Sequence, residues 1–146
     1  AHEPELLILD EPVASLDPIA RRQFIEQLIE VASDGKRAII FSSHIVSDME
    51  RIANQVWMLQ NGRLSYQGGL DELKESIARV TISADAELPS PLPLENSISQ
   101  RHHGRQATVT LANWQPELQQ QLSQQFNARV MVEYLSLEEI FLEMNA

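Results

Sequence analysis

Two short runs of apolar residues, each followed by polar residues, constrain the fold of this chain more than any other feature. Residues 6–9 read Leu-Leu-Ile-Leu and residues 38–41 read Ala-Ile-Ile-Phe, so neither run alternates with polar side chains. Runs that are apolar on both faces are typical of buried strands in a parallel sheet. We therefore expect two buried parallel strands, joined by a crossover connection.

The segment between the two runs has the pattern of a helix. Asp17 is a favoured N-cap residue and Pro18 a favoured first helical residue. Apolar residues recur at helical spacing over residues 24–32, and Gly35 marks the end. A second short helix is expected over residues 45–53. The order strand, helix, strand, helix predicts an α/β fold for this part of the chain.

A hairpin and a third helix are expected next. Residues 56–59 and 64–66 are strand-like and flank Asn61-Gly62, a strong signal for a two-residue hairpin turn. Residues 70–76 have the pattern of a short helix. We place the boundary of the first domain after residue 76.

Residues 77–146 predict a small α+β domain. Strand-like patterns occur at residues 80–82, 107–111 and 130–132, and helical patterns occur at residues 118–126 and 137–144. Three prolines in residues 88–94 predict an extended surface loop. We expect Trp57 and Trp114 to be core or half-buried, and His102-His103 to lie in a solvated turn rather than at a metal site.

The composition excludes several classes of protein. The absence of cysteine rules out disulfides, thiolate metal sites and cysteine nucleophiles. The 11 basic and 21 acidic residues give a net charge of −10, which disfavours binding to nucleic acid. No apolar run approaches the roughly 20 residues of a membrane helix, and no leader pattern opens the chain. We expect a soluble, acidic, cytoplasmic protein without membrane insertion.

Chemistry-bearing side chains follow both apolar runs. Asp10 and Glu11 end the first run, at the strand end where open α/β sheets bind ligands. One carboxylate can hold Mg²⁺, and its neighbour can orient or deprotonate a water that attacks phosphorus. The alternative is a strand that simply leaves the core into solvent. The second run ends in Ser42-Ser43-His44.

In this order, the motifs resemble the second half of an ABC-type ATPase domain, a partial P-loop NTPase fold with a parallel sheet and flanking helices. The resemblance covers about residues 1–75. The matching segments are Ala1–Pro4 (the connection after the signature helix), Leu6–Asp10 (the Walker B strand), Glu11 (the catalytic glutamate), Ser15–Asp17 (the D-loop), His44 (the H-loop histidine) and Val56–Gly62 (the hairpin that follows).

The resemblance implies ATP and Mg²⁺ as cofactors. Glu11 and His44 would be catalytic: Glu11 would act on the attacking water, and His44 would hydrogen-bond the γ-phosphate. Asp10, Ser15 and Asp17 would bind the nucleotide, and Asp10 would also support Mg²⁺.

Simpler interpretations of three of these residues stay open. His44 also suits a cap of the helix that follows it. Asp17 suits the N-cap of the Pro18 helix and an ion pair with Arg21, four residues on. Ser15 fits ordinary turn chemistry.

Two family motifs are absent, namely the phosphate-binding Gly-x-x-x-x-Gly-Lys loop and the Leu-Ser-Gly-Gly-Gln signature. We therefore expect the C-terminal portion of a longer ATPase subunit, inactive alone. The resemblance implies a dimer of nucleotide-binding domains. It also implies a separate membrane permease and a peripheral position on the inner face of the plasma membrane.

Residues 12–18 and 42–50 resemble ATP-binding subunits of multidrug, antibiotic or sodium export systems, and Ser136–Leu142 resembles the end of their accessory domain. The implied function couples ATP hydrolysis to export. Two alternatives remain. A non-transport ABC ATPase would be expected to carry basic arms or coiled-coil insertions, and a non-catalytic interaction module would use ATPase-like strands only to bind a partner. The transported compound is not indicated.

Overall fold

A computed structural model describes residues 6–145 of the chain. The chain divides into two compact units, Ala1–Ala53 and Asn54–Ala146. The resemblance of Ala1–Pro4 to a family connection lies outside the described residues. The domain boundary expected after residue 76 stays a prediction.

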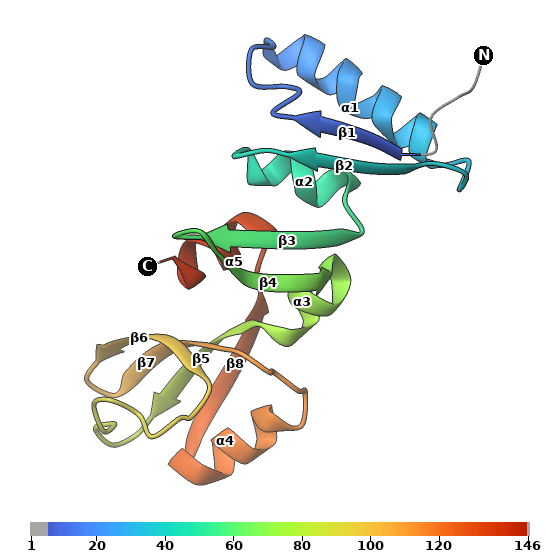
Figure 1. Cartoon of the computed structure of the whole chain (residues 1–146). Helices are drawn as coiled ribbons and strands as arrows, with labels where there is room; N and C mark the ends of the chain where they lie inside the picture. Colours follow the sequence, from blue (N-terminus) through green and yellow to red (C-terminus); the bar gives the residue numbers. More distant parts are fainter. Residues whose placement is uncertain (1–5, 146) are drawn as a thin grey trace, which may run out of the picture. The chain divides into compact units, whose positions relative to one another are not determined.

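The first unit contains a parallel pair of strands with two helices (Figure 1). Strand β1 (Leu6–Asp10) pairs in parallel with β2 (Ala38–Ser42), helix α1 (Pro18–Ala32) connects them, and α2 (Val46–Ile52) follows. Val13, Ile25 and Leu28 are the buried apolar residues of this unit. The expected succession of strand, helix, strand and helix is confirmed, as is the parallel pairing of the two strands.

The expectation that these strands are buried on both faces is wrong. Leu6, Ile8 and Ile40 are 49%, 68% and 49% exposed, whereas the alternate residues along both strands are partly buried. Each strand pairs only with the other among the described residues, and the exposed alternate side chains show that one face of the pair is open. The apolar sequence of both strands therefore predicts more burial than the structure shows.

A hairpin opens the second unit. Strand β3 (Gln55–Gln60) pairs antiparallel with β4 (Arg63–Gly69), and helix α3 (Leu70–Ser76) follows. Asn61 and Gly62 form the turn with φ values of 51° and 75°, the positive angles that a type I′ hairpin turn requires. The turn and the short helix are as predicted.

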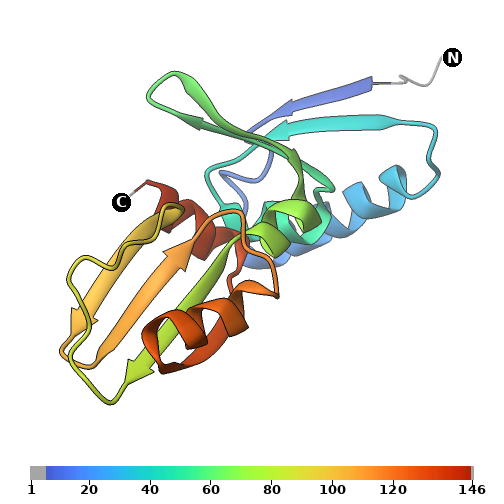
Figure 2. The ribbon, with the colours of Figure 1, turned by 90° about the horizontal axis from the view of Figure 1, so that it is seen from below.

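The rest of the second unit is a four-stranded antiparallel sheet with two helices. The elements are β5 (Ala78–Ala84), β6 (Ser97–His103), β7 (Gln106–Leu111), α4 (Leu118–Phe126), β8 (Ala128–Tyr134) and α5 (Leu137–Met144). The strand order is β6-β7-β5-β8, and α4 lies alongside β8 (Figure 2). The sequence patterns predicted every element except β6, and the α+β class of this region is as expected.

One face of this sheet forms the main core. Strand β5 is central, and its alternate residues Ala78, Val80 and Ile82 are completely buried. The register places Val80 between Val109 of β7 and Val132 of β8, so the period-2 pattern of three strands converges on one apolar layer. Helix α4 adds Leu122 to the same cluster.

The segment at residues 88–94 is extended but is not merely a surface loop. Leu88 and Leu92 are 8% and 2% exposed and belong to the core cluster. Gln100 of β6 fixes the segment, because its side-chain oxygen accepts from the Leu92 N–H at 2.8 Å and its NH₂ donates to the Leu92 carbonyl at 3.1 Å. The prolines explain the extended backbone, whereas the leucines explain the burial.

The two tryptophans have different environments. Trp114 is 5% exposed, as expected. Trp57 is 64% exposed, so the expectation of a packed side chain is wrong for it. Strand β3 turns Val56 and Met58 inward, and Trp57, between them, must point to the opposite face.

The other face of the sheet is polar and is joined to α5 by charged side chains. Arg79 donates to Glu139 and to Glu143, each at 3.2 Å, and the Ser99 hydroxyl donates to Glu143 at 2.7 Å. Burial raises the pKa of Glu143, but the Ser99 hydrogen bond and Arg79 outweigh it, so this pKa is lowered below its usual value of 4.5. Only the ionised carboxylate can accept all of these bonds.

We predict that Glu143→Gln lowers the free energy of unfolding at pH 7 by about 1–2 kcal/mol, since a charge-assisted pair becomes a neutral one. A lowered folded-state pKa stabilises the fold above the unfolded-state value and loses that contribution as pH falls through the folded-state value. The difference between wild type and variant should therefore shrink progressively as the pH falls below about 4.5 in urea unfolding followed by tryptophan fluorescence. An equal difference at pH 3 and pH 7 would contradict this account.

Candidate functional site

The polar ends of β1 and β2 meet because the two strands pair in register. Asp10 is aligned with Ser42, the last residues of the two strands. The Ser42 hydroxyl donates to Asp10 Oδ1 at 2.5 Å and accepts from the Glu11 N–H at 3.1 Å. The Glu11 N–H is also within 3.1 Å of the Ser42 carbonyl oxygen. Ser42 thereby holds the side chain of Asp10 and the backbone of Glu11.

Glu11 and His44 are brought into direct contact. Glu11 Oε2 lies 3.0 Å from His44 Nδ1. A carboxylate only accepts hydrogen bonds, so this contact places the imidazole proton on Nδ1 and leaves Nε2 directed elsewhere. The two side chains are 37% and 71% exposed, which leaves this pair open to a ligand. Glu11 has a φ of 45°, a left-handed conformation uncommon for a residue with a side chain.

His44 does not cap the helix that follows. Helix α2 has no side-chain cap bond at Ile45, whose N–H is bound instead by the Ser43 hydroxyl at 2.9 Å. The capping interpretation of His44 is therefore wrong, and its imidazole is committed to Glu11.

Asp17 caps α1 as predicted. Its side-chain oxygen accepts from the Ala20 N–H at 2.8 Å, and Pro18 begins the helix. Arg21, expected to pair with Asp17, forms its ion pair with Asp48 of α2 at 3.9 Å. That separation is too long for a hydrogen bond, and the Arg21 Nε and Asp48 Oδ2 atoms are buried without one among the described residues.

The structure therefore brings Asp10, Glu11 and His44 together around Ser42. Ser15 and Asp17 lie in the turn and helix start that follow Glu11, and both are exposed. Among residues 6–145, no hydrogen bond joins either of them to the three grouped residues. Sequence reasoning missed the bridging role of Ser42; the signal that finds it is the equal length of two parallel strands that both end in polar residues.

His102 and His103 do not form a turn, and that expectation is wrong. Both lie at the end of strand β6, before the turn at Gly104. His102 Nε2 lies 2.9 Å from the Gln100 side-chain oxygen, so it joins the network that holds Leu92. Within the described part of the chain, no group of three or more potential metal ligands is found.

Helix α1, with 15 residues, is the longest helix in the described range. Across residues 6–145, no helix has both the length and the apolar character needed to cross a membrane.

Sequence relatives of the chain are ABC transporter ATP-binding proteins. The chain is 40% identical over 74 residues to the uncharacterized ABC transporter ATP-binding protein YxlF of Bacillus subtilis (strain 168), which is 51% of this chain and 24% of that protein. It is 40% identical over 89 residues to YhaQ, another such protein of the same strain, covering 60% of this chain and 30% of the relative.

A third relative has a named role. The chain is 36% identical over 109 residues to the molybdenum import ATP-binding protein ModC of Yersinia pestis, covering 75% of this chain and 30% of ModC. No family model matches the chain. The chain spans less than a third of the length of each of these three relatives.

We predict that Asp17→Ala lowers the free energy of unfolding by about 1 kcal/mol, because the Ala20 N–H loses its acceptor. Asp17→Asn keeps an acceptor at the same place and should cost less than half as much. Urea unfolding followed by far-ultraviolet circular dichroism measures both. An equal loss in the two variants would assign the effect to charge rather than to capping.

Proposed function

We propose that this chain is part of the ATP-binding and ATP-hydrolysing subunit of an ABC-type transport system. The observation that carries the proposal is the contact between Glu11 and His44 at the ends of two adjacent parallel strands, with Asp10 beside it. Ligand sites of parallel α/β sheets lie at this edge. The ABC transporter ATP-binding proteins among the relatives support the same conclusion independently.

Asp10 fits a role in holding Mg²⁺. Mg²⁺ in nucleotide sites is held by one or two carboxylates together with phosphate oxygens and waters, so a lone strand-end carboxylate is sufficient from the protein. The Ser42 hydroxyl donates a hydrogen bond to Asp10 Oδ1 and fixes the orientation of the carboxylate. When bound, the metal would neutralise charge on the β- and γ-phosphates.

Glu11 and His44 divide the chemistry at the γ-phosphate. Glu11 Oε2 accepts the hydrogen bond from His44 Nδ1, so Glu11 Oε1 would be the atom that orients the attacking water and accepts its proton. His44 donates through Nδ1 to Glu11, so it can also donate to a phosphate oxygen through Nε2 only as an imidazolium.

The larger assembly follows from the proposed family role. We propose that Ser15 and Asp17 contact nucleotide at the seam between two nucleotide-binding domains, and that a separate permease chain provides the membrane passage. The subunit then lies on the cytoplasmic face of the membrane. The resemblance of residues 12–18 and 42–50 supports export, whereas the relative ModC carries an importer's name.

This chain alone is proposed to be inactive. It contains no Gly-x-x-x-x-Gly-Lys loop, which supplies most of the phosphate-binding contacts in P-loop enzymes. The exposed Leu6, Ile8 and Ile40 support a place for β1 and β2 inside a larger sheet. A nucleotide titration of the 146-residue chain should show no binding at micromolar ATP.

We predict that Glu11→Gln, made in a longer protein in which this segment follows a phosphate-binding loop, lowers ATP turnover at least about a hundredfold. Nucleotide binding should be retained, because the amide keeps the shape of the carboxylate but does not take a proton. Turnover and bound nucleotide are measured on the same purified sample. The matched control is Glu30→Gln on the exposed surface of α1, which should leave turnover unchanged.

Unchanged turnover in the Glu11→Gln protein would remove Glu11 from this role. Failure of the longer wild-type protein to bind ATP at all would favour an interaction module instead.

We predict that His44→Ala in the same protein lowers turnover about a hundredfold, because the attacking water and Glu11 lose their positioning group. ATP affinity should change less than threefold, since one exposed imidazole contributes little beside Mg²⁺ and the phosphate loop. Steady-state turnover and equilibrium binding of labelled ATP separate the two effects. A loss of binding that matches the loss of turnover would show that His44 only holds nucleotide.

A further inference from the structure

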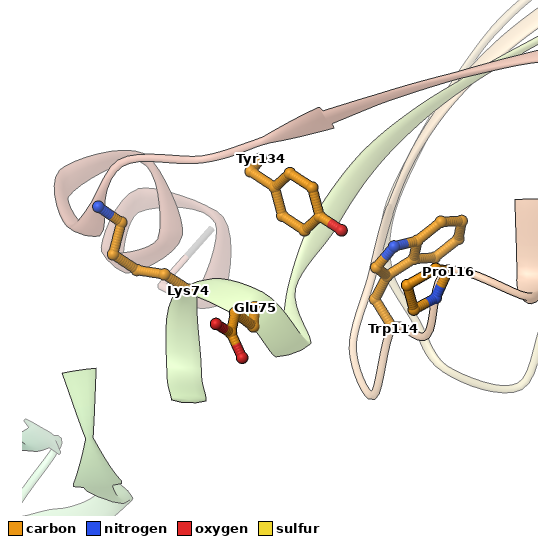
Figure 3. A pocket seen from close by; sticks show the side chains of 5 residues that line it. All are labelled: Lys74, Glu75, Trp114, Pro116 and Tyr134. Carbon is orange, nitrogen blue, oxygen red and sulfur yellow. The ribbon is translucent and has the colours of Figure 1, made fainter. Parts of the chain in front are cut away.

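A surface pocket in the second unit is separate from the proposed ATPase residues. Its volume is 560 Å³, within the range of small-molecule sites. Figure 3 shows the five side chains that line it, namely Lys74, Glu75, Trp114, Pro116 and Tyr134. They come from α3, from the connection between β7 and α4, and from the last residue of β8.

The indole of Trp114 points to a missing hydrogen-bond acceptor. Trp114 is 5% exposed, and its Nε1 is buried without a partner within the described range. In Figure 3 the nitrogen lies on the edge of the indole that faces Tyr134. The Trp114 backbone N–H is already bound by the Ser76 carbonyl at 2.8 Å, so the loop is anchored, and the buried ring N–H is the donor that lacks a partner among the described residues. Buried donors nearly always have an acceptor in native proteins.

Tyr134 and Pro116 favour a flat, apolar body on their side of the pocket, whereas Lys74 and Glu75 are charged. Tyr134 is 54% exposed, so a face of its ring is accessible, whereas the buried Trp114 offers only its edge. Pro116 is exposed and adds a second apolar surface. Aromatic rings prefer offset stacking on such a face, and surface side chains such as Tyr134 reorient rapidly to admit a ligand.

We propose that this pocket binds a planar heteroaromatic molecule that stacks on Tyr134 and accepts a hydrogen bond from Trp114 Nε1. The site lies in the second unit and does not depend on the proposed ATPase function. Its ligand class is set by two requirements, an aromatic body for the tyrosine face and an acceptor at the rim of that body for the indole.

Quinoline and naphthalene test the proposal on the whole 146-residue chain. The two molecules have the same shape, but only quinoline carries a ring acceptor. The chain is labelled with ¹⁵N, and the Trp57→Phe variant assigns the Trp114 indole signal. Quinoline should shift this N–H signal downfield with saturation and bind about five- to tenfold more tightly than naphthalene, which should not produce the downfield shift.

Variants of the walls test the stacking contact. Tyr134→Ser should weaken quinoline binding about tenfold, and Pro116→Ser, on the other wall, should weaken it by a smaller factor. The matched control is Met131→Ser, which changes a 72% exposed residue of the same strand that does not line the pocket.

Three results would overturn the proposal. They are an unmoved Trp114 indole signal at millimolar quinoline, equal affinities for quinoline and naphthalene, and unchanged quinoline binding in the Tyr134→Ser protein. ATP turnover enters none of these measurements, so a failure here is distinguishable from a failure of the proposed ATPase role.

Discussion

The parallel register of β1 and β2 is the constraint on which the candidate site depends. It aligns Asp10 with Ser42 and so brings Glu11 and His44, the residues just beyond the two strands, to one edge. A slip of one residue would turn every side chain of a strand to the opposite face and separate these groups. Glu11 holds a left-handed backbone, which costs an ordinary residue about 1–2 kcal/mol. Two hydrogen-bond acceptors on Ser42 offset that cost.

The two units satisfy their own apolar patterns to different degrees. In the second unit, Val80 and Ile82 of the central strand are completely buried by neighbouring strands, α4 and the segment around Leu92. In the first unit, Leu6 and Ile8 lie in an apolar run of the sequence, but they are exposed. Under the proposed function, the exposed face of β1 would be covered by other parts of a longer ATPase subunit. The second unit needs no such addition for its core.

Local patterns were sufficient for the elements that carry strong signals. Asp17-Pro18 predicted the start of α1, and Asn61-Gly62 predicted the hairpin, because each signal acts on its own backbone. Strand β6 was missed because Ser97–His103 is largely polar, and it is a strand through its pairing with β7. The burial of Leu92 also depends on a contact outside its own segment, because the Gln100 side chain that holds it is eight residues away.

The sequence could also predict which residues stand at the site, but not how they are joined. Asp10 and Glu11 are neighbours in the chain, and their proximity needs no fold. The contact between Glu11 and His44 spans 33 residues and requires the strand register. The polar end of the second strand marks the position of Ser42 in the sequence, but its bridging role appears only when its hydroxyl is placed between Asp10 and the Glu11 N–H. Likewise, Arg21 pairs with Asp48 across two helices rather than with its near neighbour Asp17.

The charge of the site limits what these residues can do by themselves. Two carboxylates and one imidazole form a group that repels a triphosphate unless cations accompany it. Arg21, a cation of the same unit, is already paired with Asp48. Under the proposed function, the attractive charge would come from Mg²⁺ carried by the nucleotide and from a phosphate-binding loop, a motif that this sequence does not contain. If the proposed function holds, the strand-end residues would position water and metal, and most of the affinity for nucleotide would come from a phosphate-binding loop.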